Sequence, residues 1–108
     1  MALFHASSGD VQDVRPLGDR IAVTQTHALF KARQLEVIRL VLAQGRALPV
    51  HHVEGEITIL CIEGSLTVDL DLGSKRLDAG ELLFLDGGVR HGITALADAS
   101  ALVTIALT

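Results

Sequence analysis

Residues 45–57 of this sequence read GRALPVHHVEGEI, and residues 80–91 read GELLFLDGGVRH. Both segments begin at a glycine, contain a histidine and are bordered by short apolar runs. Glycine adopts positive φ at little cost, so glycines at such borders suit tight turns. The two segments therefore predict short strands joined by sharp turns, with a histidine carried on each segment.

The rest of the chain repeats this alternation of apolar runs and turn residues. Residues 57–62 are apolar and β-branched and predict a buried strand, and 65–71 alternate as a half-buried antiparallel strand does. Three further strands are predicted at 21–26, at 82–85 as a buried run, and at 101–107. A tight hairpin turn is expected at Gly73 and Ser74. Many short strands with little helix signal predict an all-β sandwich or barrel.

Residues 28–43 (ALFKARQLEVIRLVLA) are the ambiguous segment. They are rich in helix formers, and Gly45 is suited to cap a helix there. The same residues include apolar pairs that suit a buried strand, and a short apolar run cannot be assigned by its period alone. Arg39 lies within this run and needs either an exposed face or a buried partner.

The bulk composition excludes several classes of function. The chain has 108 residues, enough for one domain, with 49% hydrophobic residues and a net charge of −4. An acidic chain without a basic patch does not favour a nucleic-acid partner. No apolar run approaches the roughly 20 residues that a membrane helix needs. Cys61 is the single cysteine, so a reducing, cytoplasmic compartment is the simplest expectation.

The first segment resembles the first signature motif of the cupin family, small β-barrels that often hold one metal ion. His51 stands at the position of the motif's first histidine, and Gly64 stands at its final glycine. Val53 stands where the motif has a second histidine, and Ile57 where it has a glutamate. The frame is thus retained while two of its ligand positions carry apolar residues.

The second segment resembles the second cupin motif. Gly80, Gly88 and His91 match its positions, whereas Asp86 replaces a proline and Ala95 replaces an asparagine. The resemblance covers roughly residues 35–107. It implies one cupin domain over 1–108, folded as an antiparallel jelly-roll barrel (a double-stranded β-helix), with 36–43 as a strand. Residues 1–13 are then a loose arm or a first edge strand.

The resemblance implies a metal site in which three histidines and a glutamate hold Fe, Mn, Ni, Co or Zn. In this sequence His51 and His91 are the remaining candidates. Glu56 is a third if a bulge at Gly55 turns it inward. His52 is expected to face away from His51 because alternate strand residues point to opposite sides. The alternative is a metal-free pocket in which both histidines bind backbone or water.

The pocket is expected to be lined by six residues: His51, Val53, Ile57, Ile59, Cys61 and His91. By parity from Ile57, Cys61 also points inward. It could be a reactive thiol beside a histidine. A small buried hydrophobe is the commoner role for such a cysteine.

Three functions follow as hypotheses. The first is a binding module that holds a small molecule in the barrel, with weak or no metal. The second is a metal-dependent oxygenase, isomerase or lyase that uses His51 and His91, by analogy with other cupins. The third is a purely structural domain. The resemblance also implies a homodimer.

Overall fold

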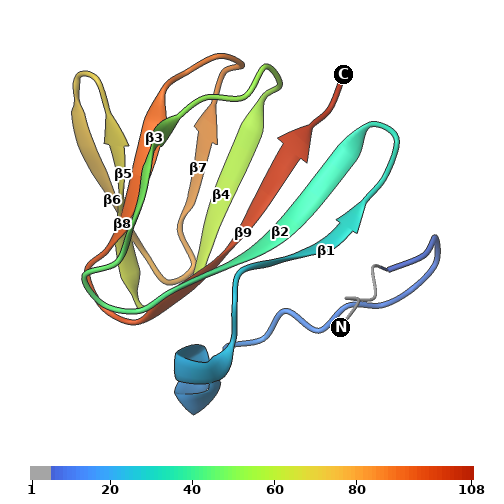
Figure 1. The fold of residues 1–108 in the computed structure, drawn as a ribbon, viewed down its shortest axis with the longest axis horizontal. Coiled ribbons are helices and arrows are strands. Elements are labelled where there is room, and N and C mark those ends of the chain that lie inside the picture. Colours follow the sequence, from blue (N-terminus) through green and yellow to red (C-terminus); the bar gives the residue numbers. More distant parts are fainter. Residues whose placement is uncertain (1–5) are drawn as a thin grey trace.

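A computed structural model describes residues 6–108 of the chain (Figure 1). One 3-10 helix, η1 (Gly18–Val23), precedes nine strands in this described part. The strands are β1 (His27–Lys31), β2 (Leu35–Leu42), β3 (Ala47–His51), β4 (Ile57–Glu63), β5 (Ser65–Leu70), β6 (Gly73–Asp78), β7 (Leu82–Leu85), β8 (His91–Ala95) and β9 (Ala99–Ala106).

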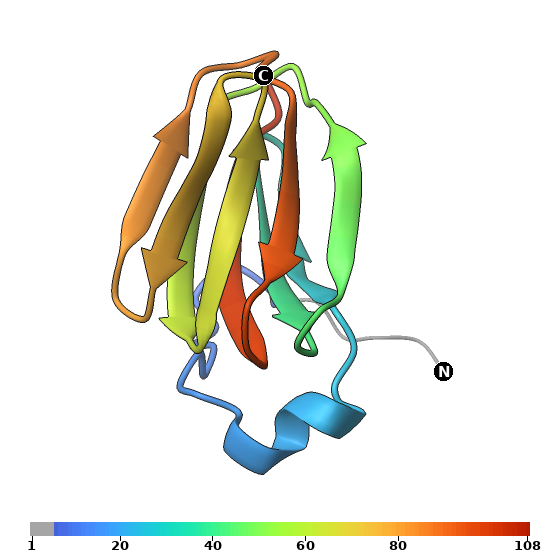
Figure 2. The same ribbon diagram turned by 90° about the vertical axis from the view of Figure 1, so that its left-hand side faces the viewer.

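The strands form two antiparallel sheets that face each other (Figures 1 and 2). One sheet has the order β1-β2-β9-β4-β7, and the other has the order β3-β8-β5-β6. Strands distant in sequence are therefore neighbours, as β9 lies between β2 and β4. This is the all-β jelly-roll barrel that the sequence predicted, and the fold prediction is confirmed.

The core lies between the sheets and is built from alternate residues of their strands. Ile59, Cys61, Val68 and Ala101 are fully buried there. Removing one leucine- or isoleucine-sized side chain from water contributes about 1.5–3 kcal/mol. The inward residues of β4 and β9 thus hold the five-stranded sheet against the other sheet.

Several predicted strands are confirmed. Residues 57–62, 65–71 and 101–107 correspond to β4, β5 and β9, and the segment 36–43 is β2. The helical alternative for 28–43 is wrong. β2 is hydrogen-bonded to β1 on one side and to β9 on the other, so tertiary pairing outweighs the local helix preference.

The predicted strand at 21–26 is wrong, because η1 covers Gly18–Val23. Only Ile21 of that run is buried, and Val23 is 83% exposed. With one inward apolar residue, the run has no sheet face to bury, which explains why it turns instead of extending.

The hairpin turn predicted at Gly73 and Ser74 lies two residues earlier. Leu70 pairs with Gly73 across the hairpin, which leaves Asp71 and Leu72 as the turn residues. Gly73 has a φ of +124°, a backbone conformation that favours glycine. The glycine is therefore needed at the first residue of β6 and not within the turn. The alternation of 65–71 located the strand but not its last residue.

Residues 82–85 form the predicted strand β7, but they are not a buried run. β7 is the edge of its sheet, and Leu82 and Phe84 are 63% and 56% exposed on its outer side. Apolar character alone did not distinguish an edge strand from a central one.

The N-terminal segment forms no strand over residues 6–13, and residues 1–5 lie outside the described part. A backbone hydrogen bond from Ala6 to Leu29 attaches this segment to β1. Within residues 6–108, no helix has the length and apolar character needed to cross a membrane.

Candidate functional site

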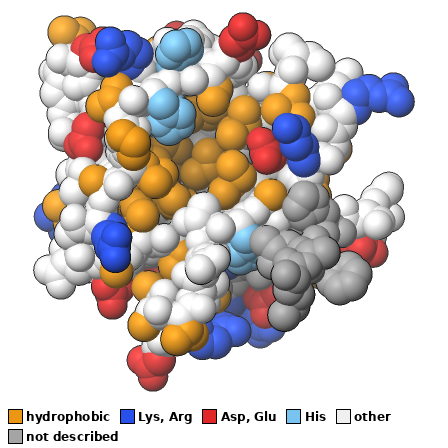
Figure 3. Space-filling model, in the orientation of Figure 1, with side chains coloured by type: hydrophobic (Ala, Val, Ile, Leu, Met, Phe, Trp, Pro, Cys, Tyr) orange, Lys and Arg blue, Asp and Glu red, His pale blue; other side chains and the backbone are white. Residues whose placement is uncertain are grey.

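A small cavity of about 120 Å³ opens between the two sheets. Its walls are mainly aliphatic side chains from β2, β4, β8 and β9, among them Leu40, Ile57, Ile93 and Val103. Figure 3 shows the apolar hollow, with histidine side chains near its rim. Two of its lining residues, His51 and His91, are ionisable.

These two histidines lie opposite each other on neighbouring strands. His51 ends β3, His91 begins β8, and the two are register partners. Their ring centroids are 4.7 Å apart, and the rings are tilted by 48°. His91 is only 3% exposed, whereas His51 is exposed at the mouth. The pair therefore runs from solvent to the cavity wall.

Each imidazole is oriented by a backbone carbonyl two residues before it. Nδ1 of His51 lies 3.1 Å from the Pro49 carbonyl oxygen, and Nδ1 of His91 lies 3.0 Å from that of Val89. A carbonyl only accepts, so both Nδ1 atoms carry the proton. In the neutral ring Nε2 is then a hydrogen-bond acceptor. Neither Nε2 is hydrogen-bonded to any of residues 6–108.

The structure brings together four of the six residues predicted to line the pocket: His51, Val53, Ile57 and His91. Ile59 and Cys61 also point inward on β4, but they are packed in the closed core beyond the cavity. Burial raises the pKa of the Cys61 thiol, with only partial compensation from the Glu63 backbone. This environment suits a packed hydrophobe more than a reactive nucleophile.

Glu56 does not line the cavity, and its side chain is exposed. Its carbonyl accepts a hydrogen bond from the Ala106 backbone, which ties this connection to the end of β9. Gly55 beside it lies so close to Ala106 that a side chain could not fit between them. The β3–β4 connection is thus fixed in a path that leaves Glu56 outside.

Sequence reasoning missed the contribution of β2 and of the residues before β1. Ile38, Leu40 and Thr26 also line the cavity. The alternation along β2 could have predicted the inward positions of Ile38 and Leu40, because Ile38, Leu40 and Leu42 alternate with outward residues. Thr26 had no such signal, since its segment was assigned to a strand that does not form.

The two histidines are a poor fit to a catalytic transition-metal site. Such sites use about three protein ligands. Here the inner motif positions are Val53 and Ile57, which offer no donor atom. Among residues 6–108, no three His, Cys, Asp or Glu side chains are grouped as a metal site requires. This donor set alone provides at most two imidazole ligands.

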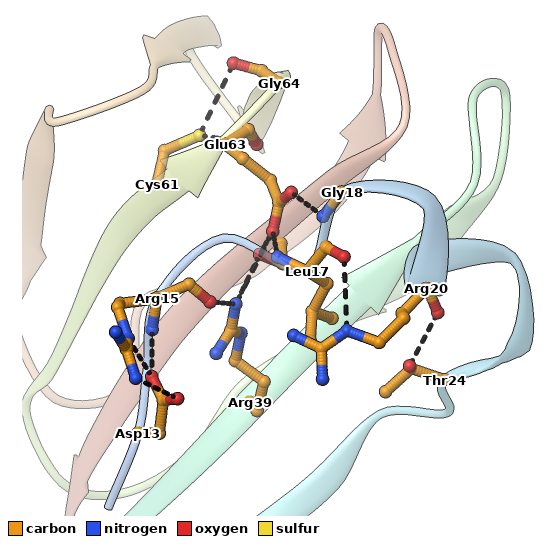
Figure 4. Close-up of polar contacts among 11 residues, drawn as sticks. Asp13, Arg15, Leu17, Gly18, Arg20, Thr24, Arg39, Cys61, Glu63 and Gly64 are labelled. Carbon is orange, nitrogen blue, oxygen red and sulfur yellow. Dashed lines mark hydrogen bonds and ion pairs between the residues drawn. The ribbon is translucent and has the colours of Figure 1, made fainter.

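A second polar group lies on the side of the five-stranded sheet that faces away from the cavity (Figure 4). Arg39 of β2 lies 3.5 Å from the Glu63 carboxylate and donates to Ser100 of β9 and to the Arg15 carbonyl. Glu63 also accepts hydrogen bonds from Ser100 and from the backbone of Leu17 and Gly18. The carboxylate thus attaches the start of η1 to the sheet.

The ionised form of Glu63 is favoured by these contacts. Burial by itself raises the pKa of this carboxyl group. The hydrogen bonds from Ser100, Leu17 and Gly18, with the charge of Arg39, outweigh burial and lower the pKa below its ordinary value of 4.5. Arg39 was expected to need either an exposed face or a buried partner, and the Glu63 carboxylate is that partner.

Comparison with known families identifies the class of the protein. The cupin domain family matches residues 38–107, which is most of the chain. The protein therefore belongs to the cupin family, as its two motifs implied. A comparison with curated proteins gave no match.

Solved structures share the fold. A cupin superfamily protein from Desulfitobacterium hafniense superposes with a TM-score of 0.78 at 15% identity, covering 95% of this chain and all (100%) of that one. An RmlC-like cupin from Desulfovibrio desulfuricans gives 0.70 at 24% identity, covering 94% and 97%. KdgF from Halomonas sp. gives 0.70 at 20% identity, covering 100% and 96%. At these identities the likeness concerns the fold.

Proposed function

We propose that this protein is a small-molecule binding module whose ligand occupies the cavity between the sheets. One observation carries the proposal: an apolar cavity lined by two histidines whose Nε2 acceptors have no hydrogen-bond partner among residues 6–108. Nε2 of a neutral imidazole accepts a hydrogen bond, so an acceptor without a protein partner at a cavity wall is suited to a ligand or water.

The size of the cavity limits the ligand. An apolar cavity of about 150 Å³ is large enough to bind benzene. At about 120 Å³ the present cavity suits a ligand part of similar or smaller size, and its mouth at His51 leaves room for the remainder. Larger ligands, which fill roughly 300 Å³ or more, would have to extend outside.

The experiment is a screen of benzene-sized compounds by ¹H–¹⁵N NMR. Binding in the cavity should shift the amide signals of Ile57, Ile93 and Val103, which line it, while those of β6 remain unchanged. Shifts confined to surface loops, or no saturable shifts at all, would contradict the proposal.

A metal-dependent enzyme is the alternative. It would hold one divalent transition metal on His51 and His91, with water or substrate supplying the other ligands. The proposal of a binding module predicts well below one metal atom per chain by elemental mass spectrometry. It also predicts equal melting temperatures with and without added Zn²⁺ or Mn²⁺. A stoichiometric metal that is lost in a His51→Ala, His91→Ala double variant would favour the enzyme.

We also propose that the chain forms a homodimer through the outer face of the five-stranded sheet. Leu82, Leu60 and Leu102 are cross-strand neighbours on this face of β7, β4 and β9. The corresponding row on the other sheet is Arg76, Thr67 and Thr94. A sheet with one solvated face normally carries polar residues there. A row of leucines such as this one is suited to the same row of a second copy across a twofold axis.

Sedimentation velocity tests the dimer. Wild-type protein should sediment as a dimer, and Leu82→Glu should shift it to the monomer, because two carboxylates would meet an apolar face. Leu72→Glu, the same change at the exposed β5–β6 turn of the other sheet, is the matched control and should leave the dimer intact. A wild-type monomer at high concentration would contradict this proposal.

A further inference from the structure

We propose that the cavity selects small apolar molecules that carry a neutral hydrogen-bond donor, such as a phenol or an alcohol, and rejects carboxylates. This inference rests on the proposed binding function and specifies the chemical class of its ligand. It follows from which atoms of the two histidines are already engaged.

The free polar atoms at the cavity wall are acceptors. The Pro49 and Val89 carbonyls fix the proton of each ring on Nδ1, at 3.1 and 3.0 Å. Nε2 of His51 and Nε2 of His91 are therefore the atoms left for a ligand, and in neutral imidazole they accept. A ligand hydroxyl can donate to either atom, whereas a ligand carbonyl or carboxylate can donate to neither.

The wall of the cavity itself, within the described chain, offers a carboxylate no Lys or Arg partner. None of its described lining residues is Lys or Arg. One adjoining groove, which shares Val53 and Ile105 with the cavity, contains the carboxylates of Glu36 and Glu54. Another, which shares Thr26 and Leu48 with it, contains Arg46, outside the cavity wall. A bound carboxylate would lose its hydration without gaining a cation, which is costly in an apolar site.

The apolar walls require the rest of the ligand to be hydrophobic. Leu40, Ile57, Ile93 and Val103 offer no hydrogen bond to a sugar or other polyhydroxylated molecule. Each hydroxyl buried among them without a partner would weaken binding. One donor group on an aliphatic or aromatic body of about benzene size meets both requirements.

The test compares phenol, toluene and benzoate as probes of similar shape, by NMR titration of the full chain at about pH 8, where an ordinary histidine is neutral. Phenol should bind roughly fivefold to tenfold more tightly than toluene, as one net hydrogen bond allows. Benzoate should bind more weakly than toluene.

The outcomes separate this inference from the proposed function. If toluene binds in the cavity as well as phenol does, the binding function stands and the donor preference is wrong. If benzoate binds most tightly, the donor preference is also wrong. If none of the three shifts the signals of Ile57, Ile93 and Val103, the binding function itself fails, and this inference with it.

Variants at the mouth of the cavity test whether Nε2 of His51 is the atom that accepts a hydrogen bond from the ligand. His51→Leu removes one acceptor at an exposed position, so the fold should persist, and the ratio of toluene Kd to phenol Kd should fall. His51→Gln returns an amide oxygen near the Nε2 position and should restore part of the ratio. His52→Leu is the matched control, because His52 does not line the cavity. An unchanged ratio in His51→Leu with a reduced one in His52→Leu would overturn the assignment.

Discussion

The pair His51 and His91 and the group Arg39, Glu63 and Ser100 are both polar clusters set among apolar strands, and they differ in their hydrogen-bond partners. The Glu63 carboxylate is engaged by protein groups from three places in the chain. The histidines are each engaged on one nitrogen, and the other nitrogen has no partner in the described residues. The first cluster is therefore suited to stability and the second to binding.

Substitution of Glu63 should give the largest effect. Glu63→Ala removes the acceptor for Leu17, Gly18 and Ser100, and it leaves the 3%-exposed Arg39 guanidinium without its carboxylate. Removing one partner of a buried ion pair costs about 3–5 kcal/mol. Urea denaturation should show a loss of this size in the free energy of unfolding.

The matched control for that experiment is Glu56→Ala. Glu56 is exposed, and its side chain has no hydrogen bond within the described chain, so the change should stay within about 0.5 kcal/mol. Equal effects of the two substitutions would show that the Glu63 cluster has no special structural role, and the contrast between the two polar clusters would be lost.

Acid should weaken the same cluster. The pKa of Glu63 is lower in the folded protein than its ordinary value of 4.5, so its contribution is fully present above about that pH. It is lost as the pH falls below 4.5 through the lower, folded-state pKa. Urea midpoints measured from pH 7 to pH 3 should therefore fall more steeply for wild type than for Glu63→Gln, which cannot ionise.

Asp69 belongs in that experiment as a second acid-sensitive group. Burial raises the pKa of Asp69, but hydrogen bonds from Ser74, Thr94 and Thr67 outweigh it and lower the pKa below 3.8. Its contribution therefore disappears at lower pH than 3.8 and is common to wild type and Glu63→Gln. Parallel curves for the two proteins would mean that Glu63 contributes nothing to the acid sensitivity.

Local patterns predicted the fold class, and the family resemblance predicted the rest. Turn residues and alternating strands such as 65–71 are local features that indicate an all-β sandwich or barrel, whereas the jelly-roll fold and the roles of His51 and His91 came from the resemblance to the two cupin motifs. β2 could be assigned only with the help of the family resemblance. Its strand state depends on pairing with β1 and β9, which no local pattern contains.

The features that sequence reasoning missed depend on contacts between distant residues. Glu63 joins residues 17 and 18 to Arg39 and Ser100, and none of these positions marks the others in the sequence. The orientation of Glu56 depends likewise on the approach of Gly55 to Ala106. Which nitrogen of each histidine is free could not be inferred without the carbonyls of Pro49 and Val89.

Substitution of His51 should have only a small effect on stability, well below that of Glu63. His51→Leu removes an exposed side chain whose only hydrogen bond to the described part of the chain is with the nearby Pro49 carbonyl. The free energy of unfolding should change by less than about 1 kcal/mol, since surface changes without a buried partner are usually small. Urea denaturation beside Glu63→Ala measures the contrast directly. A loss as large as that of Glu63→Ala would mean that the mouth histidine is a structural element, and that the free Nε2 atoms are no sign of a ligand.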